Sequence, residues 1–167
     1  MDVIEAMETC SAARYLKPDP VPQDLIERVI YAATRASSPG NSQEWDFIVV
    51  RNPEAKRKIR DLLAPRFKAM REGLPTTGQS TSRMMAGAMH LAETLSEVPA
   101  IIFVCGPVAY PPNAPMEQFV WSALYPAAQN LIVAARSVWA QPSRPSRCLW
   151  KANSASCWEF PRTSNSA

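Results

Sequence analysis

The sequence contains one histidine, His90, and four widely spaced cysteines among its 167 residues. Zinc and iron sites draw on clusters of histidine and cysteine, so this composition argues against such a metal centre. The four cysteines form neither a CxxC pair nor the framework of a small disulfide-linked domain; they are Cys10, Cys105, Cys148 and Cys157. The sequence therefore favours neither a metalloprotein nor a disulfide-rich secreted domain.

The sequence also lacks an apolar run of the roughly 18 to 20 residues that spans a bilayer. Its first residues, Met1-Asp2-Val3-Ile4-Glu5, are acidic and do not resemble a signal peptide. The hydrophobic fraction of 47% and the charged fraction of 20% are those of a globular protein, and the length fits one domain. We expect a cytoplasmic protein that does not bind a membrane.

Over most of the chain, basic and acidic residues are equal in number. Residues 1–139 carry 14 basic and 14 acidic residues, whereas residues 140–167 carry four basic residues and one acidic residue. The net charge of +3 therefore comes from the end of the chain alone. The body of the protein offers no basic surface for a polyanion, so we expect no nucleic-acid partner.

Helical and strand patterns alternate along the first 138 residues. Apolar spacing, proline positions and capping residues predict helices over 2–9, 23–35, 53–63, 81–95 and 116–138, the last kinked or split at Pro126. Apolar runs over 45–51 and 100–105 predict two buried strands, and the first is expected to be buried on both faces. Residues 64–80 are expected to form a surface loop. The fold class is therefore α+β or α/β, with a layered core.

A polar turn joins the helix at 23–35 to the first strand. It reads Ser38-Pro39-Gly40-Asn41-Ser42-Gln43, and it combines a fixed φ, a residue free to take positive φ, and side chains with hydroxyl and amide groups. An ordinary connection between a helix and a strand would also explain it. As a ligand site, the turn would bind a polar group through Ser38, Asn41 and Gln43.

Three segments together resemble the flavin-dependent nitroreductase family. They are Thr9-Cys10-Ser11-Ala12-Ala13-Arg14-Tyr15 with the prolines that follow, the turn through Trp45-Asp46-Phe47, and Gln129-Asn130-Leu131 in the last helix. The resemblance runs over residues 1–138 in the order and spacing of that family. It implies an α+β, three-layer α-β-α domain with a central mixed sheet.

The resemblance also implies a cofactor, FMN, and an electron donor, NAD(P)H. In that family the flavin lies at a homodimer interface, and electrons pass from the nicotinamide through the flavin to a nitroaromatic, a quinone or a similar small acceptor. The residues of this sequence that match the family's cofactor-binding positions are Ser11, Arg14, Ser38, Pro39, Asn41 and Gln43. The planar fork of Arg14 suits a phosphate, although an arginine alone could equally form a surface salt bridge. No catalytic side chain is expected, because the flavin carries the redox chemistry.

The sequence departs from the family pattern at three places. Cys10 stands where the family has a phosphate-binding arginine, and Ser37 and Glu44 replace prolines. The alternative reading is a degenerate, non-catalytic member that binds no flavin.

The sequence changes character after Val138. Residues 139–167 lack helical or strand periodicity and are rich in serine, arginine, proline and tryptophan, so we expect an irregular tail and a domain that ends at 138. A frame displaced by two nucleotides lets Val138–Pro142 encode Leu-Gly-Ala-Ala, and lets Ser156–Pro161 encode the family's Leu-Leu-Gly-Ile-Pro. We hypothesise a frameshift near residue 139 that removes the C-terminal part of the fold and impairs activity; codons that do not permit the displaced reading would contradict it.

Overall fold

The computed structural model describes residues 1–73 and 79–139. The helices are α1 (Val3–Glu8), α2 (Gln23–Ala33), α3 (Pro53–Gly73), α4 (Gln79–Glu93) and α5 (Glu117–Trp139), with a short 3-10 helix, η1 (Pro39–Asn41). The strands are β1 (Asp46–Val50) and β2 (Ile101–Cys105). The fold class is α+β, as expected. All but the first residue of the predicted tail lie outside the described residues.

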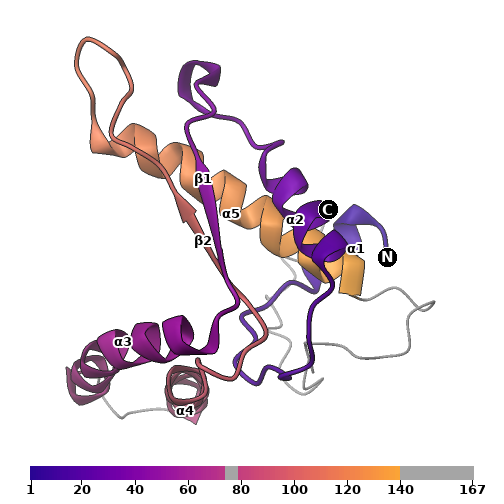
Figure 1. The fold of residues 1–167 in the computed structure, drawn as a ribbon, viewed down its shortest axis with the longest axis vertical. Helices are drawn as coiled ribbons and strands as arrows, with labels where there is room; N and C mark the ends of the chain where they lie inside the picture. Colours follow the sequence, from indigo (N-terminus) through magenta and orange to yellow (C-terminus); the bar gives the residue numbers. More distant parts are fainter. Residues whose placement is uncertain (74–78, 140–167) are drawn as a thin grey trace, which may run out of the picture.

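The main core lies where α1 and α2 pack against α5, beside the two strands (Figure 1). The apolar spacing of α2 places Leu25, Ile26 and Val29 on one face, where they are 2%, 2% and 0% exposed. On α5, Ala127 is buried, and Ala123 is buried where this helix meets the polar turn. This core holds α2 in place, and α2 leads directly into the polar turn.

The last helix is continuous through Pro126, so the expected split does not occur. The Asn130 side chain links α5 to α2, because its Nδ2 donates to the carbonyl of Ala32 at 3.3 Å. Ile132 is 40% exposed, because the buried stripe of α5 runs through Ala127 and Val133. No helix in the described ranges is long and apolar enough to cross a membrane.

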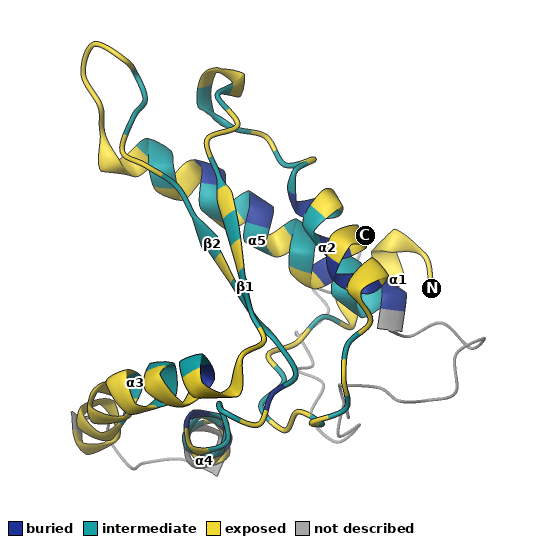
Figure 2. Ribbon diagram, viewed as in Figure 1, coloured by how far each residue is buried: buried dark blue, intermediate teal, exposed yellow. Residues whose placement is uncertain are grey.

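The strands pair antiparallel, with Asp46 opposite Cys105 and Val50 opposite Ile101. Ile48 and Phe103 lie opposite each other and are 53% and 38% exposed. Within the described chain, the prediction that the first strand is buried on both faces is therefore wrong, and β2 is not fully buried either. Figure 2 shows exposed positions along β1. An apolar run indicates that a strand can be covered on both sides, but it does not identify the element that would cover it.

Helices α3 and α4 pack against each other at the end of the sheet where β1 ends and β2 begins (Figure 1). The expected loop at 64–80 is wrong for residues 64–73, which continue α3 through Pro65. Strong helix formers on both sides of Pro65 compensate for its missing N–H. The helix predicted to begin at residue 81 also starts earlier, since α4 begins at Gln79.

A buried lysine fastens the start of α3 to the chain that enters β2. Lys56 is 6% exposed, and its Nζ donates to the carbonyl of Val98. We expect Lys56→Ala to lower the free energy of unfolding by about 1–2 kcal/mol, because it removes a buried stem and leaves a carbonyl without its donor. Urea denaturation measures this, with the exposed Lys58→Ala on the same helix as the control. Equal midpoints for the two variants would contradict the prediction.

Candidate flavin site

The polar turn has an unusual backbone. Gly40, Asn41 and Gln43 adopt positive φ angles of 59°, 51° and 52°. Non-glycine residues rarely do so, and such residues gather at ligand-binding turns. The backbone N–H of Gln43 donates to Ser38 Oγ at 3.0 Å, and Gln43 Nε2 donates to Asn41 Oδ1 at 2.9 Å. The turn is thus held by its own side chains.

These internal bonds determine what the turn offers to a ligand. They use Ser38 Oγ and Asn41 Oδ1 as acceptors. The amide of Asn41 keeps a donor at Nδ2, and the amide of Gln43 keeps an acceptor at Oε1, both on exposed residues. A ligand edge that carries both donors and acceptors would match this pair of groups.

Tyr110, which no sequence pattern singled out, packs against the turn. The ring of Tyr110 lies against Gly40 and meets Phe119 of α5 edge-on, with ring centroids 5.3 Å apart. The void left between the turn and α5 is only about 10 Å³. Proximity of Tyr110 to the turn depends on tertiary packing, so no local pattern could have revealed it.

Gly40 is required by both its backbone and its neighbour. We expect Gly40→Ala to destabilise the protein by about 1–2 kcal/mol, because a side chain at φ 59° is disfavoured and its Cβ would strike the Tyr110 ring. The double variant Gly40→Ala/Tyr110→Ala should show less than the sum of the two single costs, since the collision is gone. Additive costs in thermal unfolding would argue against the contact.

The second group of predicted site residues lies in the segment after α1. Arg14 is half-buried, and its Nη1 donates to the carbonyl of Ala12 at 3.0 Å. The side chain passes over Gly87 of α4, where an added Cβ would come within 2.8 Å of Arg14 Cδ. Ser11 is exposed, three residues earlier. Arg14 thus bonds to a backbone carbonyl and not to a carboxylate, as a surface salt bridge would require.

Cys10 and Arg136 set the charge at the start of this segment. Burial raises the pKa of the Cys10 thiol, and the nearby Arg136 guanidinium acts in the opposite direction. A thiol with a raised pKa is neutral near pH 7, so Cys10 places no negative charge beside Ser11. Arg136 reaches from α5, and its Nε donates to Thr9 Oγ1 at 3.0 Å.

The structure separates the six predicted residues into two groups. Figure 1 shows η1 beyond the end of the sheet at which β1 begins, whereas α4, which contacts Arg14, lies at the opposite end. The five-residue strand between them rises about 16 Å. One chain therefore does not bring Ser11 and Arg14 together with Ser38, Pro39, Asn41 and Gln43.

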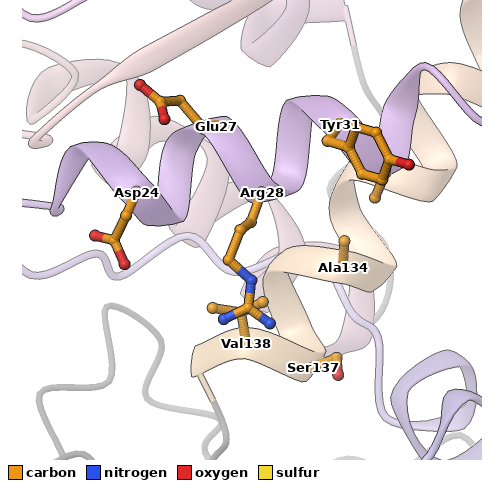
Figure 3. Close-up of a pocket in the computed structure, with 8 residues that line it drawn as sticks. Asp24, Glu27, Arg28, Tyr31, Ala134, Ser137 and Val138 are labelled. Atoms are coloured by element: carbon orange, nitrogen blue, oxygen red, sulfur yellow. The ribbon is translucent and has the colours of Figure 1, made fainter.

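A groove of about 610 Å³ lies elsewhere, between α2 and the end of α5. Figure 3 shows Arg28 extending from α2 toward Val138 across this groove. Asp24 and Glu27 also line it, and none of the six predicted residues does. Two carboxylates would repel a phosphate, so we do not assign the groove to an anionic cofactor.

A profile of the Nitroreductase family matches residues 9–138. The chain belongs to this family. Both groups of predicted residues fall within the matched range, which ends at Val138. The change of character that the sequence shows after this residue thus coincides with the end of the match.

Two curated relatives are similar over shorter stretches. An NADH dehydrogenase of Thermus thermophilus is 45% identical over 56 residues, which cover 34% of this chain and 27% of that protein. Iodotyrosine deiodinase 1 of Rattus norvegicus is 36% identical over 59 residues, which cover 35% of this chain and 21% of that protein. These matches span less than a third of either relative.

Solved structures show the nitroreductase fold. Oxidized iodotyrosine deiodinase bound to FMN and 3-iodo-L-tyrosine aligns with a TM-score of 0.68 at 18% identity, over 83% of this chain and 71% of that chain. A nitroreductase family protein from Clostridium novyi NT aligns with a TM-score of 0.60 at 15% identity, over 83% and 66%. At these identities the likeness concerns the fold, and the α+β nitroreductase architecture predicted from the sequence is confirmed.

The residues of this nitroreductase family member suit FMN chemically. The guanidinium of Arg14 and the hydroxyl of Ser11 are groups that bind a phosphate. The turn presents both a donor and an acceptor, which a hydrogen-bonding ring or a polyhydroxylated chain requires. Among the described residues, no group of three or more His, Cys, Asp or Glu side chains is placed to hold a metal ion.

Proposed function

We propose that the protein is an FMN-dependent oxidoreductase that passes electrons from NAD(P)H to a nitroaromatic, a quinone or a similar small acceptor. Family membership supports an oxidoreductase that uses a flavin, and the chemistry of the two groups of candidate side chains supports the flavin site proposed here. When bound, FMN supplies the redox chemistry, and the protein supplies position and charge. The same proposal places the enzyme in the cytoplasm.

In this proposal each residue group holds one part of the cofactor. Arg14 and Ser11 bind the phosphate, where the planar guanidinium contributes charge as well as direction. Asn41 and Gln43 meet the ring or the ribityl chain, with Ser38 and Pro39 fixing the turn that carries them. The positive φ angles of the turn support this assignment, since a strained backbone is maintained where it positions a ligand.

The observation that carries the proposal furthest is the separation of the two groups along the sheet. In this proposal the cofactor draws on two chains, with Arg14 from one copy and the Ser38–Gln43 turn from the other. A symmetric homodimer then contains two identical sites. The separation of the two groups within one chain supports a site that two chains share.

Titration of the purified chain with FMN tests the proposal. We expect quenching of flavin fluorescence that saturates near one FMN per chain, and oxidation of NADH or NADPH that depends on an added quinone or nitroaromatic. A chain restored to the displaced reading frame after residue 138 is the comparison for strength of binding. Unquenched fluorescence in both chains would overturn the proposal and favour the flavin-free reading.

A further inference from the structure

One face of α4 receives the segment that carries Arg14. The rings of Tyr15 and His90 stack with centroids 4.5 Å apart and planes inclined by 26°. One turn earlier on the same helix, buried Gly87 leaves space that the Arg14 side chain occupies. Two consecutive residues of the segment thus contact two α4 positions three residues apart, which lie on one helix face.

The segment depends on such contacts because it has little regular structure of its own. Between Cys10 and Pro22 a bridge at Leu16 is the only regular backbone pairing recorded in the described chain. Arg136 holds its beginning at Thr9, and the Nη2 of Arg51 holds its end at the Val21 carbonyl. The α4 face supplies the contact in the middle, at the residue proposed to bind phosphate.

We propose that Gly87 and His90 form a seat that orders Arg14 for the FMN phosphate, with His90 as a positioning residue. This inference rests on the proposed function. His90 stacks on Tyr15 and thereby fixes the backbone next to Arg14, while Gly87 sets the path of the Arg14 stem. The seat acts before the cofactor arrives, so it lowers the cost of ordering the binding segment.

Ordinary helix packing does not explain why a glycine stands at position 87 beside the Tyr15–His90 stack. A glycine in the interior of a helix costs stability relative to alanine. At position 87 an alanine would gain that stability but would collide with the Arg14 stem at Cδ, 2.8 Å away, and at Cβ, 3.3 Å away. The glycine thus favours the placement of Arg14 at the expense of helix propensity, as a seat for a functional side chain requires.

The test compares His90→Ala with His90→Phe, which keeps an aromatic ring for the stack. Glu93→Ala, at an exposed position of the same helix, is the matched control. We expect the Kd for FMN to rise about three- to tenfold in His90→Ala and to stay within about twofold in the other two variants. Riboflavin lacks the phosphate, so its affinity should be unchanged in all three.

Hydrogen exchange of residues 11–16 in the flavin-free protein provides a second readout. We expect faster exchange in His90→Ala than in the wild type, and wild-type exchange in His90→Phe. Unchanged exchange and FMN affinity in His90→Ala would overturn the seat. If the wild-type chain bound no FMN but His90→Ala still exchanged faster than it, the proposed function alone would be contradicted.

Gly87→Ala gives an independent check that does not depend on the stack. We expect it to weaken FMN binding at least threefold without lowering the melting temperature, because the helix gains propensity while Arg14 is displaced. A Gly87→Ala protein with wild-type FMN affinity would overturn the role of the glycine. An equal loss of FMN and riboflavin affinity would also overturn it, since the seat acts on the phosphate.

Discussion

Arg14→Ala is expected to weaken FMN binding about 10- to 100-fold, as measured by quenching of flavin fluorescence. A hydrogen bond to a charged group contributes about 1.5–3 kcal/mol, and the guanidinium can make two such bonds to one phosphate. The bond that Arg14 makes in the flavin-free protein is a local one to the Ala12 carbonyl. Loss of the side chain should therefore affect the cofactor far more than the fold.

Three comparisons make the Arg14 result specific. Arg14→Lys retains the charge without the planar fork, so its Kd should fall between those of the wild type and Arg14→Ala. Arg66→Ala removes an exposed arginine from α3 and should leave the Kd unchanged. Riboflavin affinity should not respond to any of the three. If Arg14→Ala bound FMN as tightly as Arg66→Ala, the phosphate role of Arg14 would be wrong.

Two defective chains are expected to restore one intact site when they assemble together. Arg14→Ala removes the phosphate group, whereas Asn41→Gly/Gln43→Gly removes the ring-binding side chains from the turn but tolerates its positive φ angles. Each variant alone should bind FMN weakly at every site. In a heterodimer of the two, one site receives both wild-type halves, so about one FMN should bind per dimer with wild-type affinity.

Co-expression with two different affinity tags isolates that heterodimer, and flavin absorbance after desalting gives the stoichiometry. The homodimers of each variant, purified in the same way, are the controls. A site built within a single chain would have one defect in each chain of the heterodimer, and no tight FMN would remain. That outcome, or a chain that stays monomeric at all concentrations, would contradict the shared site.

The sequence predicted the helical core because its apolar spacing is a local pattern, whereas the candidate residues Ser11 and Arg14 came from the family resemblance. The spacing of Leu25, Ile26 and Val29 identifies α2 and its buried face without reference to the rest of the chain. The polar turn likewise carries its own chemistry in its Pro-Gly-Asn sequence. The location of these elements in the chain therefore followed from short-range physics.

Features that depend on tertiary contact could not be predicted in the same way. The apolar run of β1 does not reveal that Ile48 lies on an uncovered face of the described sheet. Pro65 reads as a helix terminator, yet the residues around it sustain α3. Tyr110 packs against Gly40 of the turn, and His90 stacks on Tyr15 beside Arg14. Each of these supporting residues lies 70 or more positions away in sequence from the segment that it contacts.

The distance between the Arg14 segment and the polar turn has a consequence for mass action. If FMN contacts two chains, dilution that dissociates the chains also releases the flavin, and added FMN shifts the assembly equilibrium by the same free energy. The apparent affinity for flavin would then depend on protein concentration as well as on the contacts themselves. Colour retained by a dilute sample would thus report assembly, and a chain too scarce to pair would stay colourless however well its own half-sites were formed.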